Sequence, residues 1–428
     1  MYRSGRVSLL AVADATPEDH EIRFLDEHAE PIDYDATTDV VGVSFSTSLA
    51  PRAYEIGDEF RRRGVPVIFG GYHATFLPDE ALAHCDSVCI GEAEPVWPRM
   101  LHDLENWKLG RSYHSVARTD LIKSRPLRKN QWDSDSHETL NVVMAGRGCP
   151  NACDYCSVTE FFGNTYRHRP VEEIVKEVEA LGSKFVLFGD DNLLGDPKFA
   201  SELFQALIPL KIQWTSQGNL LLADDPALVT LAARSGCIGM FIGLETITRK
   251  NLECSGKTFY DPGRYEESIT RLTDAGIAVM AGFVFGFDHD DYRVFERTVK
   301  FIRKTRVVPT QIAILTPFPG TRLYDRLVHE QRIYERDWAK YDFRHVVFAP
   351  KLMTAQELQD GTDWAIGETY SLKALAMNAW ELLPSLGPKG LLRCALPMNF
   401  ASRQDLLNRN NPRGFRRVRR LASPAFTA

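Results

Sequence analysis

Three cysteines fall within eight residues, at Cys149, Cys153 and Cys156, and this spacing constrains the chain more than any other feature of its sequence. The 428 residues contain only eight cysteines, too few for a disulfide scaffold. Glycine and proline in the segment Gly146-Arg147-Gly148-Cys149-Pro150 mark a loop that can turn three thiols towards one point. The sequence therefore predicts a metal site in a reducing compartment, and we expect a cytoplasmic protein.

The spacing of these thiols favours an iron-sulfur cluster. Three thiolates can bind three irons of a 4Fe-4S cluster and leave the fourth iron open to another ligand. One alternative is a zinc-stabilised binding protein with His168 as fourth ligand, although Cys-x3-Cys-x2-Cys is not a usual zinc spacing. The other is a closed ferredoxin-type cluster with a remote cysteine, but Cys237 and Cys254 lack a paired spacing.

The length of the chain predicts two or three packed units, and 44% hydrophobic residues supply a large core. Residues 1–106 contain apolar runs at Val40–Val43, Val65–Phe69 and Ser87–Ile90, separated by helical stretches. This pattern is typical of a small Rossmann-like parallel sheet. Residues 107–138 lose the periodicity and become polar, which predicts a linker.

Residues 139–332 alternate strand candidates with helix candidates. The strands are expected at Leu140–Met144, Phe185–Phe188, Ile212–Ser216, Met240–Leu244, Val279–Phe285 and Gln311–Leu315. Six such units with right-handed crossovers predict an α/β fold, a partial (β/α)6 barrel of TIM type whose active site lies at the C-terminal strand ends. The cysteines directly follow the first strand and so belong at that rim. Residues 333–428 are expected to form a mainly helical C-terminal extension.

Charge and hydropathy exclude several classes of protein. A net charge of -6 argues against a surface that binds nucleic acid, so no nucleic-acid partner is expected. The tail from Arg403 to Arg420 is basic and interleaved with apolar residues, which suits peripheral contact with an anionic membrane. The alternative is a solvated tail or a helix that covers the barrel. The apolar run Val7–Ala13 precedes acidic residues and is expected to be an internal helix rather than a signal peptide.

The cysteine segment resembles the CxxxCxΦC hallmark of the radical S-adenosylmethionine superfamily, with Tyr155 as the aromatic residue. The resemblance implies that a 4Fe-4S cluster on the three cysteines cleaves S-adenosylmethionine to a 5'-deoxyadenosyl radical, while Tyr155 packs near the adenine. It also implies an electron donor such as flavodoxin or ferredoxin. Further motifs follow in the superfamily's order. The residues expected to contact S-adenosylmethionine are Tyr155, Gly189, Asp190, Asp191, Gln217, Glu245, Thr316 and Pro317.

The order of a small α/β domain, a linker and a barrel is similar to the cobalamin-binding subgroup. Its motifs are matched by Gly70-Gly71-Tyr72-His73-Ala74-Thr75 and Gly91-Glu92-Ala93-Glu94. The chain begins where a first strand would normally have passed, so we expect a shortened sheet. The DxHxxG motif of other cobalamin proteins is not matched, and His28 is expected at the surface. The residues expected to contact cobalamin are Ser44, Gly70, Gly71, His73, Gly91 and Glu92.

This resemblance implies a methyltransferase that acts on an unactivated carbon of a small-molecule or lipid-like substrate. An oxidative rearrangement or cyclisation without methyl transfer is the alternative within the subgroup. Methylthiotransferases carry a second cluster on three N-terminal cysteines, whereas this domain has only Cys85 and Cys89. The sequence therefore predicts a radical enzyme with 4Fe-4S, S-adenosylmethionine and cobalamin as cofactors.

Overall fold

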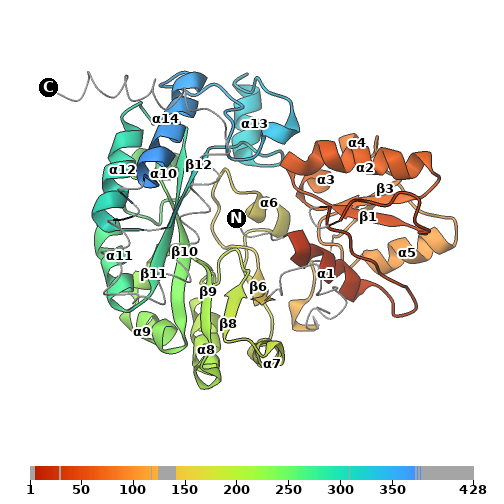
Figure 1. Ribbon diagram of the computed structural model, residues 1–428, viewed down its shortest axis with the longest axis horizontal. Coiled ribbons are helices and arrows are strands. Elements are labelled where there is room, and N and C mark those ends of the chain that lie inside the picture. The colour runs from red at the N-terminus through yellow and green to blue at the C-terminus, as the bar shows by residue number, and fades with distance from the viewer. Residues whose placement is uncertain are drawn as a thin grey trace.

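The computed structural model describes residues 5–27, 30–116, 118–123, 141–307 and 309–371, together with residues 374 and 376. Figure 1 shows a smaller N-terminal α/β unit, coloured red to orange, beside a larger unit coloured yellow to blue. His28 and the basic tail from Arg403 to Arg420 lie outside the described residues. None of the helices in the described part of the chain has both the length and the apolar composition needed to span a bilayer.

The N-terminal unit is built on a four-stranded parallel sheet. Its strands are β1 (Val41–Ser44), β2 (Val67–Gly70), β3 (Ser87–Ile90) and β4 (Ser112–His114), in the order β1-β2-β3-β4. The first three strands confirm the sequence prediction. The fourth extends the sheet into the stretch that the sequence assigned to the linker.

Helices cover both faces of this sheet. They are α1 (Gly5–Ala15), η1 (Thr47–Leu49), α2 (Ala50–Arg62), α3 (Tyr72–Phe76), α4 (Pro78–Ala81) and α5 (Trp97–Glu105), followed by η2 (Leu121–Lys123). One core joins Phe60 of α2 to Phe69 of the sheet, and a second joins Met100 of α5 to Ile68. Neighbouring residues in β2 thus face opposite cores, as the alternation of a strand requires. The first apolar run forms helix α1, in which Leu10 and Ala13 are buried.

The larger unit contains the six predicted strands in one parallel sheet. They are β5 (Val142–Val143), β8 (Phe185–Phe188), β9 (Gln213–Gly218), β10 (Cys237–Glu245), β11 (Ala278–Phe285) and β12 (Thr310–Ile314). The spatial order β12-β11-β10-β9-β8-β5 follows the chain, with β5 and β12 as the two edges. This open, sequential sheet is the expected partial barrel. A short antiparallel pair, β6 (Gly146–Arg147) and β7 (Arg167–His168), flanks it.

Helices follow the barrel strands in turn. They are α6 (Ser157–Phe162), α7 (Val171–Leu181), α8 (Pro197–Leu207), η4 (Ile208–Leu210), η5 (Leu220–Asp224), α9 (Pro226–Arg234), α10 (Arg249–Cys254), η6 (Pro262–Arg264), α11 (Tyr265–Asp274), α12 (Val294–Thr305) and α13 (Arg322–His329). Asp196 and Asp225 each cap a helix whose first residue is proline, with the carboxylate accepting from two backbone amides. Trp214, Phe188 and Phe204 are fully buried in the core that these helices enclose.

The segment after α13 contacts both units. Its described elements are η7 (Trp338–Lys340) and α14 (Ala355–Thr369), and α14 packs against α12 and β12. Trp338 of η7 donates its indole N–H to the carboxylate of Glu80, in helix α4 of the N-terminal unit, at 2.7 Å. Figure 1 shows α13 lying between the barrel helices and the N-terminal unit. The extension therefore ties the two units together on the side of the barrel rim.

Candidate active site

The cysteine loop (residues 146–156) begins in β6 and ends one residue before α6. Gly148 has a φ of +88°, and a Cβ built on it would lie 2.4 Å from the carbonyl oxygen of Thr165. Only glycine combines this backbone conformation with so close an approach. The glycine therefore lets the chain turn sharply just before Cys149, which places the three thiols on one short loop.

Gly148→Ala is expected to reduce the iron content of the reconstituted protein and to lower its melting temperature. Gly182→Ala is the matched control, since Gly182 also has a positive φ, at +60°, but a Cβ added there would meet no atom within 4 Å. The control is expected to show only the backbone cost of about 1–2 kcal/mol. Equal effects of the two substitutions on melting temperature and iron content would contradict a special role for Gly148.

The three thiols of the loop lie close enough to influence one another electrostatically. Burial raises the pKa of Cys153, and raises that of Cys156 to about 11, and the other loop thiols add to both shifts. All three cysteines are free, and the side-chain amide of Asn192 donates to the sulfur of Cys149 at 3.4 Å. No group of three His, Cys, Asp or Glu side chains in the described ranges is arranged around a single metal ion. Buried thiolates need a compensating cation, and the donor set fits an iron-sulfur cluster.

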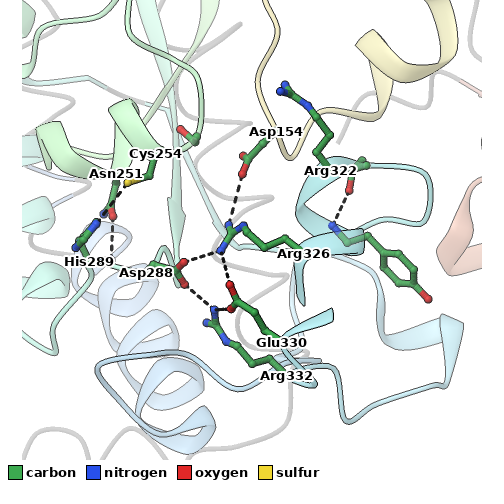
Figure 2. Close-up of polar contacts among 12 residues, drawn as sticks. Asp154, Asn251, Cys254, Asp288, His289, Arg322, Arg326, Glu330 and Arg332 are labelled. Atoms are coloured by element: carbon green, nitrogen blue, oxygen red, sulfur yellow. Dashed lines mark hydrogen bonds and ion pairs between the residues drawn. The ribbon is translucent and has the colours of Figure 1, made fainter. Parts of the chain in front are cut away.

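The middle of the cysteine loop is held between α10 and α13. The amide of Asp154 donates to Ser255 at 2.9 Å, and its carbonyl accepts from the amide of Leu323 at 2.9 Å. Arg326 of α13 lies 3.5 Å from the Asp154 carboxylate and 2.6 Å from Asp288, at the end of β11 (Figure 2). The loop is thus anchored by the far strands of the barrel as well as by its own neighbours.

Asp190, at the end of β8, orients the start of the cysteine loop. Its carboxylate accepts hydrogen bonds from the amides of Ala145 and Gly146, at 3.0 and 2.5 Å, and from the Tyr166 hydroxyl at 2.8 Å. Burial raises the pKa of Asp190 to about 7 and that of Asp191 to about 6. The partners of Asp190 give it a structural role, and contact of either aspartate with S-adenosylmethionine stays a prediction. Gly189 precedes them directly.

Glu245 ends β10 with a φ of +63°, an unfavourable conformation for a residue with a side chain. The ammonium of Lys257 donates to Glu245 at 2.8 Å and to the Gly243 carbonyl at 2.7 Å. Lys257 is 8% exposed, and its charge lowers the pKa of Cys153 against the opposing effect of burial. Glu245 and a cation that the sequence did not single out therefore lie beside the cysteine loop.

The other predicted contacts of S-adenosylmethionine lie around the same rim. The ring centroid of Tyr155 lies 5.9 Å from that of Phe287, and the buried Tyr155 hydroxyl lies beside the Cys153 thiol. Gln217 is the penultimate residue of β9 and has an exposed side chain. Thr316 and Pro317 follow β12 and are buried, with the Thr316 hydroxyl donating to Ile314 at 3.0 Å. These residues lie around one rim, and their contact with S-adenosylmethionine stays a prediction.

The residues predicted to bind cobalamin gather at the C-terminal ends of β1, β2 and β3. Ser44 and Gly70 end their strands, and Gly71 follows with a φ of +89° and no room for a Cβ beside the backbone of Phe45. Gly91 follows β3 and donates its amide to Thr75 at 3.0 Å. This is the edge at which parallel sheets bind ligands.

Two of the residues predicted to contact cobalamin, His73 and Glu92, are instead bonded to other side chains of the protein. His73 is fully buried, with Nε2 2.9 Å from the Tyr54 hydroxyl and Nδ1 without a partner among the described residues. Glu92 is 6% exposed and is bonded to arginines of the barrel unit. The structure thus gives both residues structural contacts, and their contact with a corrin stays a prediction.

Aromatic residues join the two units on the other side of the cysteine loop. Tyr72 of α3 lies 4.7 Å from Phe161 of α6, measured between ring centroids, and Phe76 packs against Phe161 at 6.4 Å. Tyr72 also lies near Cys156, and this thiol adds to the effect of burial in raising the pKa of Tyr72. The N-terminal unit therefore reaches the cysteine loop directly. The sequence showed Tyr72 only as part of a glycine-rich motif and gave no signal for its position.

Known proteins share both units. The model of the radical SAM superfamily matches residues 143–302, and that of the B12 binding domain matches residues 6–100. Two Chlorobaculum tepidum enzymes are similar over most of their length. Bacteriochlorophyllide d C-12(1)-methyltransferase is 32% identical, covering 88% of this chain and 85% of that protein, and the C-8(2)-methyltransferase is 30% identical, covering 80% of each.

Solved structures share the fold at low sequence identity. TsrM from Kitasatospora setae, a radical S-adenosylmethionine methyltransferase with cobalamin and a 4Fe-4S cluster bound, has a TM-score of 0.64 at 17% identity, covering 76% of this chain and 75% of that one. OxsB, a cobalamin-dependent radical enzyme, has a TM-score of 0.65 at 14% identity, covering 94% and 69%. With two matched domains and a relative at 32% identity, the chain belongs to the cobalamin-binding enzymes of the radical S-adenosylmethionine superfamily.

Proposed function

We propose that this enzyme methylates an unactivated carbon at the periphery of a tetrapyrrole of the chlorin type. The observation that carries the proposal is the similarity, over at least 80% of the chain, to two methyltransferases named for bacteriochlorophyllide d. Similarity to a lipid-modifying enzyme, the hopanoid C-2 methylase of Rhodopseudomonas palustris, is lower, at 26% identity. A chlorin is the substrate class that the similarity favours.

Different residues of the chain would hold each of the three cofactors. Cys149, Cys153 and Cys156 would hold the 4Fe-4S cluster, and Tyr155 would offer its ring to S-adenosylmethionine. The strand ends around Gly71, where the backbone leaves no room for a Cβ, would hold cobalamin. When bound, these groups supply a methyl group and a carbon radical. The protein's own task is to hold the three groups at fixed positions and to keep water away from the radical.

Cyclisation without methyl transfer is the competing activity. The anaerobic magnesium-protoporphyrin IX monomethyl ester cyclase of Cereibacter sphaeroides is 24% identical, and it covers 78% of this chain. This identity is below that of both bacteriochlorophyllide methyltransferases. Methyl transfer is therefore the reaction we propose.

A substrate comparison tests the proposal. The anaerobically reconstituted enzyme would be given S-adenosylmethionine, a reductant and, in separate reactions, a bacteriochlorophyllide, a hopanoid or magnesium-protoporphyrin monomethyl ester. We expect mass spectrometry to find a product one methylene heavier only with the chlorin. Methylation of the hopanoid alone would overturn the chlorin assignment, and a cyclised porphyrin product would favour the competing activity.

The partners and location follow from the same proposal. Reduction of the cluster calls for a one-electron donor such as flavodoxin or ferredoxin, and such donors and an oxygen-sensitive cluster belong in the cytoplasm. A chlorin is lipophilic, so peripheral membrane contact through the basic tail from Arg403 to Arg420 would bring the enzyme to its substrate. Flotation with anionic liposomes, repeated at high salt, tests this contact.

A further inference from the structure

One buried and one half-buried glutamate of the N-terminal unit form ion pairs with arginines of the barrel unit. Glu92 and Glu94 follow β3, and their side chains are 4% and 19% exposed. Arg147 donates Nη1 to Glu92 at 2.9 Å and Nη2 to Glu94 at 2.5 Å, and Arg167 donates to Glu92 at 3.1 Å. These contacts join the two units, because Arg147 lies more than 50 residues after both glutamates in the sequence.

Thr119, in the segment that links the two units, completes this network. Its amide donates to Glu92 at 2.9 Å, its hydroxyl donates to Glu94 at 3.3 Å, and its carbonyl accepts from Arg167 at 2.9 Å. We call Glu92, Glu94, Thr119, Arg147 and Arg167 the interdomain clamp. Each carboxylate has at least two donors, which is the condition under which buried charges are tolerated.

The interdomain clamp connects the cysteine loop to the strand ends where cobalamin is proposed to bind. The distance between these two parts of the site must be fixed. Arg147 lies two residues before Cys149, in β6. Glu92 and Glu94 lie in the loop that begins with Gly91, at the strand ends where cobalamin is proposed to bind. A planar guanidinium that spans two carboxylates fixes orientation as well as distance, which a single ammonium cannot do.

We propose that Arg147 and Glu94 are positioning residues that set the placement of the cobalamin edge relative to the cysteine loop, and so couple radical formation to methyl transfer. This inference rests on the proposed function. Radical formation needs only the cysteine loop and S-adenosylmethionine. Methyl transfer also needs the N-terminal unit to be correctly placed relative to the cysteine loop. Loosening the clamp should therefore separate the two reactions.

The test uses Glu94→Gln in the full-length protein, with Glu59→Gln as control. Glu59 pairs with Arg62 and Arg63 of its own helix, so its loss leaves the clamp intact. In Glu94→Gln we expect unchanged iron and sulfide, 5'-deoxyadenosine formation within about threefold of the unsubstituted enzyme, and methyl transfer lower on the order of 100-fold. An unchanged ratio of deoxyadenosine to methylated product would overturn the proposal.

Amide hydrogen exchange on the cofactor-free protein provides a readout that needs no substrate. Because the amide of Thr119 donates to Glu92, it is expected to exchange about tenfold or more faster in Glu92→Gln than in Glu59→Gln, since a charge-assisted hydrogen bond of the clamp is weakened. Unchanged exchange would contradict the clamp itself. Failure of the unsubstituted enzyme to methylate a chlorin would instead reject the proposed function, so the two failures are distinguishable.

Arg147→Lys is the second variant, for the case in which Glu94→Gln does not fold. Lysine keeps the positive charge but lacks the fork that reaches both carboxylates. We expect an intermediate ratio of deoxyadenosine to methylated product. A ratio equal to that of the unsubstituted enzyme would show that geometry does not matter, and would overturn the proposal.

Discussion

Cys149→Ala is expected to abolish cleavage of S-adenosylmethionine and to lower the iron and sulfide content of the reconstituted protein to background. Two thiolates cannot hold the cluster in the geometry that three provide, and the other free cysteines of the described ranges lie outside the cysteine loop. The measurement is 5'-deoxyadenosine by chromatography, alongside iron and sulfide analysis. The effect should be the largest of any single substitution, because the reaction has no route without the cluster.

The control for this experiment is Cys254→Ser. Cys254 is exposed at the end of α10, close to the cysteine loop but outside it, and its sulfur lies 3.5 Å from His289. Figure 2 shows this pair facing away from Asp154. We expect the control to keep its cluster and its cleavage activity. Retention of both by Cys149→Ala would contradict the assignment of the cluster to this loop.

Lys257→Met is expected to lower the free energy of unfolding by about 3–5 kcal/mol, because it leaves Glu245 without its counterion in a buried site. The two side chains are only 10% and 15% exposed. Urea denaturation of the cofactor-free protein under reducing conditions measures the change. The double variant Lys257→Met/Glu245→Gln should recover part of the loss, since no uncompensated charge remains.

Lys176→Met is the matched control for that prediction. Lys176 forms a comparable pair with Glu173 at 2.7 Å, but its side chain is 67% exposed. Exposed pairs are screened by solvent and contribute little to stability, so we expect a small change. If Lys257→Met and Lys176→Met destabilised the protein equally, the buried pair would not have the importance that its surroundings indicate.

The barrel and the N-terminal sheet were predictable because their strands are almost continuous apolar runs. Strand β8 was expected at Phe185–Phe188 and has those bounds. Strand β4 was missed because, of its three residues Ser112–His114, only Tyr113 is buried. A strand this short leaves no alternation for the sequence to show.

The cysteines of the site were predictable because their spacing is local, whereas the residues that surround them come from distant segments. Lys257 and Asn192 each occupy ordinary positions in the sequence, and only the fold brings them to the cysteine loop. Glu92 was expected to face cobalamin because the sequence around it shows only a glycine-rich strand end. The sequence does not show the arginines that bind Glu92. Pairings between distant residues are the part of a site that local patterns do not contain.

Transfer of a labelled methyl group tests the central claim most directly. The reconstituted enzyme would be incubated with cobalamin, a bacteriochlorophyllide and S-adenosylmethionine that carries a deuterated methyl group. We predict a chlorin product that contains all three deuterium atoms of that methyl group. We also predict that 5'-deoxyadenosine forms in step with it. Formation of deoxyadenosine without transfer of the labelled methyl group to any substrate would contradict the account.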